Sequence, residues 1–171
     1  MPWFRRRAPA PAALHVFLAA GCAGVPTLAQ APDPLELVKE GRRLSVAGRH
    51  DEALALYEKA LAAEPDLFDA HLGAGIALDL KGDYTRARRH LEQAIDVAPE
   101  AGRASALAAM AVSYVFEGRT ADAVRYYRQL FDLQMSAGAF DGAAATANAL
   151  GRVYLEGGDP DAAQTWYTRG Y

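Results

Sequence analysis

The chain has 171 residues, about the length of one domain. Hydrophobic residues make up 51% of it, and alanine, the best intrinsic helix former, is prominent, whereas the β-branched clusters typical of strands are scarce. The formal net charge of −3 argues against a nucleic-acid partner, because binding to phosphate needs a basic surface.

The first 29 residues have the order of a secretory signal. Arg5, Arg6 and Arg7 form a basic cluster, an apolar stretch follows over residues 12–23, and small residues stand two apart at Thr27 and Ala29. We therefore predict a signal peptide over residues 1–29, cleaved after Ala29 or alternatively after Ala31, and a linker over residues 30–33. The charge-free run is also long enough for an uncleaved membrane anchor.

Cys22 is the only cysteine, so the mature fold has no internal disulfide. The run Leu18–Cys22 resembles a bacterial lipoprotein box, although its leucine lies one residue too far from the cysteine. Two interpretations of Cys22 are therefore open: it is a small apolar residue inside the signal peptide, or it is lipidated. Each alternative predicts a periplasmic or secreted protein, or one anchored in the membrane and facing the periplasm. Without residues 1–29, the chain has 15 Lys and Arg against 21 Asp and Glu, a formal charge of −6.

An internal repeat follows the signal. Glycines at positions 48, 82, 118 and 158 each precede an alanine by five residues. Glycine suits the left-handed turn that ends a helix. Short acceptors or acids follow where the next helix is expected to begin, at Asp51, Thr85, Asp122 and Asp161.

The predicted helices on either side of these turns share a pattern of small and large residues. Small side chains let two helix backbones approach, and a large side chain one turn further along lies on the same helix face. The small residues before the turn are Gly41, Gly75, Ala111 and Gly151, those after it are Ala53, Ala87, Ala123 and Ala163, the large ones are Tyr57, Leu91, Tyr127 and Tyr167, and further small ones are Ala60 and Ala94.

This pattern resembles the tetratricopeptide repeat, with its period of about 34 residues, paired small residues and closing prolines, here Pro65 and Pro99. The resemblance covers residues 34–171 and implies an all-α fold, an α-solenoid of antiparallel helix pairs. We expect about four units, at residues 34–67, 68–101, 104–137 and 144–171, with the last incomplete.

The third unit departs from the pattern. Leu130 stands where a small residue is expected, and no proline closes the unit. We expect its second helix to run from about Ala121 through Met135 and a longer connection to follow over residues 136–142.

No catalytic constellation is found. His50, His71 and His90 are expected in a turn, a first helix and a second helix, without a common face, and no serine has the flanking glycines of a nucleophile elbow. We therefore predict no metal site, no cofactor and no enzymatic activity, with an unrecognised active site as the remote alternative.

The resemblance implies instead a concave face, formed by the first helix of each unit, that binds a protein or a peptide. By register its residues include Leu35, Val38, Arg42, Leu72, Ile76, Asp79, Val112, Val115, Asn148 and Arg152. The predicted function is a non-catalytic scaffold or adaptor, exported to the cell envelope or secreted. The alternative is a component of envelope assembly, attached to the membrane only through the N-terminus or lipidated Cys22.

The last predicted helix is short and carries Trp166, Tyr167 and Tyr171. A repeat stack that ends without a polar helix exposes an apolar face. We expect these aromatics to be uncovered, either because the chain is a fragment of a longer repeat protein or because this end mediates self-association or partner docking.

Overall fold

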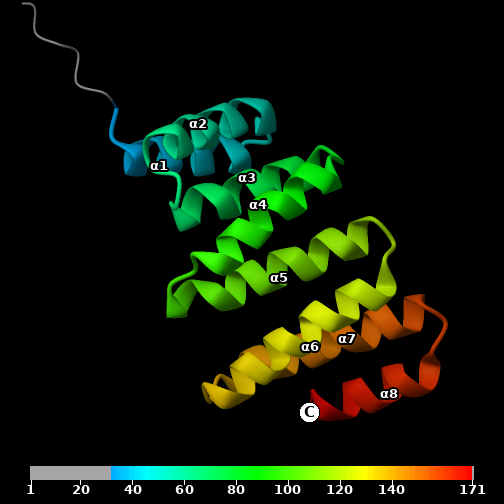
Figure 1. Cartoon of the computed structure of the whole chain (residues 1–171). Coiled ribbons are helices and arrows are strands. Elements are labelled where there is room, and N and C mark those ends of the chain that lie inside the picture. Colours follow the sequence, from blue (N-terminus) through cyan, green and yellow to red (C-terminus); the bar gives the residue numbers. More distant parts are fainter. Residues whose placement is uncertain (1–31, 171) are drawn as a thin grey trace, which may run out of the picture. The chain divides into compact units, whose positions relative to one another are not determined.

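The computed structural model describes residues 32–170. The predicted signal peptide, its alternatives and Cys22 lie outside the described residues, as does Tyr171. The described part consists of eight α-helices (Figure 1), with these bounds: α1 Pro34–Val46, α2 His50–Ala63, α3 Phe68–Leu80, α4 Tyr84–Asp96, α5 Glu100–Phe116, α6 Thr120–Ser136, α7 Phe140–Glu156 and α8 Pro160–Arg169.

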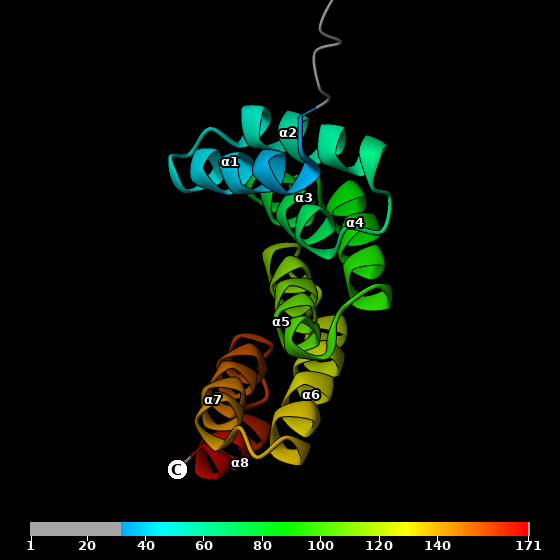
Figure 2. The ribbon, with the colours of Figure 1, turned by 90° about the vertical axis from the view of Figure 1, so that its left-hand side faces the viewer.

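Successive helices pack as antiparallel pairs and the pairs stack on one another (Figure 2). The second helix of each pair contacts the first helix of the next, and α1 contacts α3 as α3 contacts α5. Within residues 32–170 the secondary structure is helix and turn alone, so the all-α helical-repeat prediction is confirmed.

The predicted glycine turns have the expected backbone. Gly48, Gly82, Gly118 and Gly158 have φ angles of 76°, 80°, 73° and 83°. In each turn the residue after the glycine donates its backbone N–H five residues back, as Arg49 does to the carbonyl of Leu44 at 2.9 Å. This bond is one of the two that define the Schellman motif, and it satisfies a helix-end carbonyl.

The predicted longer connection over residues 136–142 is wrong. Gly138, with a φ of 69°, forms a fifth turn of the same kind, and the N–H of Ala139 donates to the carbonyl of Gln134 at 2.8 Å. Helix α6 therefore continues to Ser136 and α7 starts at Phe140. The signal was available, because Gly138 precedes Ala143 by the same five residues as in the other turns.

Two helices also begin earlier than the proposed unit boundaries. Helices α5 and α7 start at Glu100 and Phe140, rather than at positions 104 and 144, and each has 17 residues. The first helices of the first two units, α1 and α3, have 13 residues each. The first helices of the third and fourth units are thus longer than those of the first and second units.

The small residues of the repeat lie where helix pairs meet. A Cβ atom added to Gly41 would lie 2.8 Å from the ring of Tyr57, one on Gly75 would lie 2.6 Å from Leu91, and one on Gly151 would lie 2.6 Å from Tyr167. Alanines at the matching positions are almost fully buried: Ala53, Ala60, Ala87, Ala94, Ala111, Ala123 and Ala163. Tyr127 is buried as well. In the third unit, buried Leu130 takes the place of the small residue.

The buried side chains form two clusters that meet at α4. One cluster extends from Leu37 on α1 to Ala87 on α4, and the other from Leu91 on α4 to Trp166 on α8. Helices α4 and α5 also contact each other less extensively than any other two successive helices. The division between the two clusters therefore falls within α4, and the boundary between the second and third units lies inside the second cluster, in which Leu91 of α4 is grouped with Leu107 and Met110 of α5.

Trp166 is not exposed, contrary to the sequence prediction. Its ring packs edge-on against Phe131 of α6 with centroids 5.2 Å apart, and the guanidinium carbon of Arg169 lies 4.7 Å from its centroid. The outer side of α8 presents mainly polar residues, among them Asp161, Gln164, Thr165 and Thr168. This helix therefore covers the preceding pair and turns a polar surface to the solvent.

Candidate partner-binding groove

A groove of about 610 Å³ runs across the first helices of the first three units. Its volume is within the range of ligand-binding clefts in proteins. The residues that line it come from α1, the neighbouring face of α2, α3, and the start of α5: Arg42, Ser45, Val46, Tyr57, Phe68, Asp69, Leu72, Gly73, Ile76, Pro99, Ala101, Gly102 and Ser105.

Aromatic rings close the floor of the groove because glycines leave room for them. A Cβ atom added to Gly73 would lie 2.5 Å from the ring of Tyr57, and one added to Gly102 would lie 2.6 Å from the ring of Phe68. Tyr57 thus fits between Gly41 on α1 and Gly73 on α3. The same glycines that allow the helices to approach also bring an aromatic surface into the groove.

The charges on the rim compensate each other. The Nη2 of Arg42 donates to Oδ1 of Asp69 at 3.0 Å and so links α1 to α3. The hydroxyls of Ser45 and Tyr57 lie 3.4 Å apart. Ile76, 41% exposed, provides accessible apolar surface between these polar groups. The groove is therefore suited to an uncharged apolar segment whose backbone needs both donors and acceptors.

The structure brings only part of the predicted concave face together. Arg42, Leu72 and Ile76 line the groove. Leu35, Asn148 and Arg152 are exposed but do not line it, and Val112 and Val115 are half-buried against the second core cluster.

Two residues of the predicted face are not accessible. Val38 is 4% exposed because it belongs to the core between α1 and its neighbours. Asp79 is 6% exposed and accepts a hydrogen bond from Ser113. The prediction that these two side chains contact a partner is therefore wrong, since register along a helix gives the direction of a side chain but not the depth at which it lies.

Sequence reasoning also missed a set of exposed apolar residues at the ends of the first helices. Val46, Leu80 and Phe116 are 87%, 53% and 50% exposed. Each lies two residues before a turn glycine, so they occupy equivalent places in the first three units. That recurrence was the available signal. Val46 belongs to the groove, and the other two add apolar surface at the same end of α3 and α5.

Beneath this surface, a buried polar pair joins the second and third units. Ser113 Oγ on α5 donates to Asp79 Oδ1 on α3 at 2.7 Å, and neither side chain is exposed. Burial raises the pKa of the Asp79 carboxyl to about 6, although the Ser113 hydroxyl and the nearby Arg88 both favour the charged form. The junction therefore holds a carboxyl that titrates near neutrality.

Two histidines form another pair across α3 and α4, which corrects the prediction that they share no face. The Nδ1 atoms of His71 and His90 lie 3.1 Å apart, and His71 Nε2 lies 2.7 Å from the carbonyl oxygen of Pro65. Since that carbonyl only accepts, Nε2 of His71 carries a proton, and in the neutral pair His90 Nδ1 donates to His71 Nδ1. Burial, with His71 and Arg86 nearby, lowers the pKa of His90.

Two searches for other sites gave no candidate in the described part of the chain. Residues 32–170 contain no group of three or more His, Cys, Asp or Glu side chains placed to hold a metal ion. None of the helices described above combines the length and apolar character needed to cross a membrane.

The stacked pairs and the groove across their first helices define a helical-repeat protein of the α-solenoid class. Two models of the tetratricopeptide repeat match the sequence, one over residues 47–113 and one over residues 102–171. The chain belongs to the tetratricopeptide repeat family. Comparison with the sequences of curated proteins finds no match.

Solved structures with a similar fold come from proteins of different kinds. A fragment of MamA from Desulfovibrio magneticus RS-1 superposes with a TM-score of 0.69 at 22% identity, covering 81% of this chain and 73% of that one. The type IV pilus biogenesis factor PilW gives 0.67 at 21% identity, covering 78% and 59%. Kinesin light chain repeats from Podosopora anserina give 0.68 at 18% identity, covering 80% and 72%. At these identities the likeness concerns the fold alone.

Proposed function

We propose that this protein is a non-catalytic adaptor that binds an apolar segment of a partner protein in the groove across α1, α3 and α5. The observation that carries the proposal is the groove itself, with exposed apolar residues on its surface and an internally compensated ion pair on its rim. Repeats of this family typically act as scaffolds for protein partners. Apolar contacts would supply affinity, and Arg42 and Asp69 would hold the backbone of the bound segment.

Site-specific crosslinking in cells tests the location of the site. A photoactivatable residue at Ile76 should crosslink to a discrete partner, whereas the same residue at Gln129, exposed on the second helix of the third unit, should not. Capture of the same proteins from both positions would contradict the assignment of the groove.

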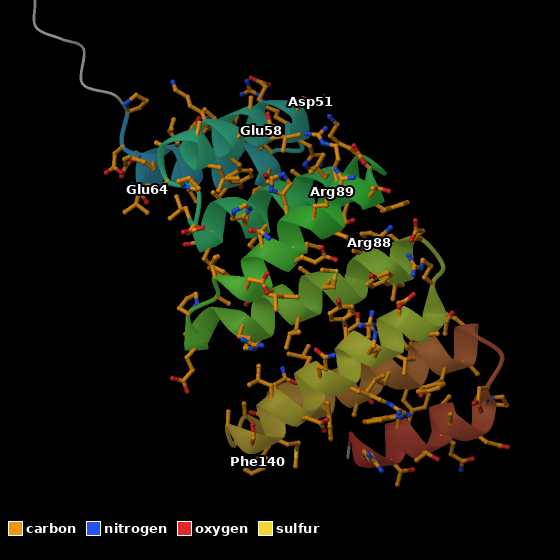
Figure 3. All side chains as sticks on the ribbon, in the orientation of Figure 1. Asp51, Glu58, Glu64, Arg88, Arg89 and Phe140 are labelled. Carbon is orange, nitrogen blue, oxygen red and sulfur yellow. The ribbon has the colours of Figure 1, made fainter. Side chains whose placement is uncertain are left out.

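We expect Ile76→Asp to lower the affinity for the captured partner at least tenfold. The substitution places an unpaired charge in a contact from which water is excluded. Because Ile76 is 41% exposed in the free protein, the fold should tolerate the change, which circular dichroism would verify. Phe140→Asp, at the exposed first residue of α7 (Figure 3), provides the matched control and should leave affinity unchanged.

We further propose that the protein is exported, with the mature chain in the periplasm or outside the cell. The support is the order of basic cluster, apolar stretch and small residues in the first 29 positions. Mass spectrometry of the protein recovered from a bacterial envelope fraction should show a mature N-terminus at residue 30 or 32. A lipid-modified N-terminus at Cys22, or a full-length membrane-bound chain, would support the anchored alternative, and full-length protein in the cytosol would contradict both.

A further inference from the structure

A second, polar pocket of about 420 Å³ lies between α6 and α8, the second helices of the third and fourth units (Figure 1). It has no lining residue in common with the groove, which is formed mainly by first helices. The residues that line it are Arg128, Asp132, Ala162, Thr165, Trp166 and Arg169. The charged side chains and the threonine are exposed, so the pocket is accessible to other molecules.

Two guanidinium groups lie over one indole ring in this pocket. The guanidinium carbons of Arg169 and Arg128 are 4.7 Å and 5.7 Å from the centroid of the Trp166 ring. The ring itself is 7% exposed and is held by its edge-on contact with Phe131. A cation over an aromatic ring is attracted by the electrons of its face. This contact orients both arginines, and because it uses no hydrogen-bond acceptor, it leaves N–H donors at the edge of each guanidinium for an anion.

Neither arginine forms an ion pair within the described part of the chain. The ion pairs between described residues include neither Arg128 nor Arg169. On α6, Arg125 pairs with Asp122, whereas Nη2 of Arg128 donates to the hydroxyl of Tyr154 at 2.8 Å. From residue 30 onward the chain has a formal charge of −6, so two arginines side by side without acidic partners are a local exception. Two like charges near one ring repel each other, and an anion bound between them is attracted by both.

We propose that this pocket binds one carboxylate, presented by an acidic side chain of a protein partner. Arg128 and Arg169 donate to the carboxylate, and Asp132 accepts a backbone N–H of the same partner segment. The site lies outside the groove and has different chemistry, so it does not depend on the adaptor function proposed above.

The charge and the openness of the pocket define this class of ligand. Two guanidinium groups and the carboxylate of Asp132 leave one net positive charge among the lining residues. One carboxylate neutralises that charge, whereas a phosphate group, with a charge of about −2, exceeds it and is repelled by Asp132. Sites for free small molecules bury most of the ligand's surface, which an open pocket does not do. A side chain carried by a protein is also held by contacts outside the pocket.

Nuclear magnetic resonance of the full chain with Trp3→Phe tests the site, because Trp166 is then the only tryptophan. The probe is the peptide acetyl-Gly-Glu-Gly-amide, and the same peptide with glutamine in place of glutamate is the neutral control. We expect the glutamate peptide to shift the indole N–H signal of Trp166 saturably, with a dissociation constant of roughly 1 mM for so small a contact. The glutamine peptide should give no saturable shift, and inorganic phosphate at pH 8 should bind more weakly than the glutamate peptide.

Variants of the lining residues locate the binding in the pocket. Arg128→Gln and Arg169→Gln should each lower the affinity for the glutamate peptide about tenfold, the scale expected for loss of one charged hydrogen-bond partner. Arg89→Gln, which removes an exposed arginine of α4 outside the pocket (Figure 3), should leave the affinity unchanged. Asp132→Asn removes the opposing charge, so it should strengthen the binding of phosphate more than that of the glutamate peptide. Circular dichroism verifies that each variant is folded.

Several outcomes would overturn the proposal. The site would be absent if the glutamate peptide gave no saturable shift, or if the glutamine peptide bound equally well. An equal loss of affinity in Arg89→Gln would show that the general surface charge attracts the peptide. Tighter binding of phosphate than of the glutamate peptide by the native protein would contradict the assignment to a carboxylate. These results are independent of crosslinking at Ile76, so the pocket and the groove can fail separately.

Discussion

Tyr57→Ala should lower the free energy of unfolding by about 3–5 kcal/mol, the range measured for deletion of a buried aromatic ring. The ring of Tyr57 is 2% exposed and lies between Gly41 on α1 and Gly73 on α3, where neither glycine has a side chain that can move into the space. Loss of the ring therefore leaves a cavity between the first two units. Urea denaturation followed by circular dichroism gives the free energy directly.

Phe140→Ala is the matched control for this experiment. It removes a side chain that is 65% exposed, at the first residue of α7, so its effect on the free energy of unfolding should lie within about 0.5 kcal/mol of zero. Similar losses for the two variants would show that Tyr57 does not fill the joint between the first two units, and the floor of the groove would then need to be assigned differently.

Most of the fold was readable from the sequence because the repeat depends on local chemistry. The turn glycines, and the alanines five residues after them, predict where helices end and which faces meet. The connection over residues 136–142 was predicted wrongly because Gly138 lies between two units, where a closing proline was expected. Its turn nevertheless has the same hydrogen bond as the other glycine turns. The early starts of α5 and α7 could not be predicted from capping residues, because Pro99 and Ala139 make no side-chain capping bond.

The candidate site was only partly predictable. Helical register places Arg42, Leu72 and Ile76 on one face, and the structure brings these three into the groove. Register does not say how deeply a position is covered by the next unit, which is why Val38 and Asp79 were assigned to the surface. Depth depends on stacking of successive pairs, a tertiary property that no single helix encodes.

The polar pairs between helices were difficult to predict from the sequence. Asp79 and Ser113 each lie in an otherwise apolar stretch, but they occupy different positions in their units, because Asp79 lies three residues before Gly82 and Ser113 lies five residues before Gly118. The histidine pair was harder to predict because His71 and His90 lie on the two helices of one unit, and their contact depends on the crossing of α3 and α4.

Two titrating groups, Asp79 on α3 and His90 on α4, act on the pH dependence of stability with opposite signs. Asp79 has a raised pKa, so its contribution is complete below its ordinary pKa of 3.8 and is lost as the pH rises through about 6. His90 has a lowered pKa, so its contribution is present above its ordinary pKa of 6.5 and is lost as the pH falls below that value. Between these limits the native protein should show a shallow dependence of stability on pH, because the two losses oppose each other.

Asp79→Asn should separate these opposing contributions. An asparagine at this position still offers an oxygen to Ser113 but has no charge to bury, so at pH 8 the variant should be more stable than the native protein by about 1–3 kcal/mol, the scale set by a pKa rise of roughly two units. At pH 4.5, where Asp79 is largely protonated in the native state, the difference should be much smaller than at pH 8. Urea denaturation at both pH values measures the difference, with the exposed Asp132→Asn as a control that should match the native protein throughout. Equal destabilisation of Asp79→Asn at both pH values would mean that Asp79 contributes through the geometry of its hydrogen bond alone, because only a group that titrates in this range makes the effect of the substitution depend on pH.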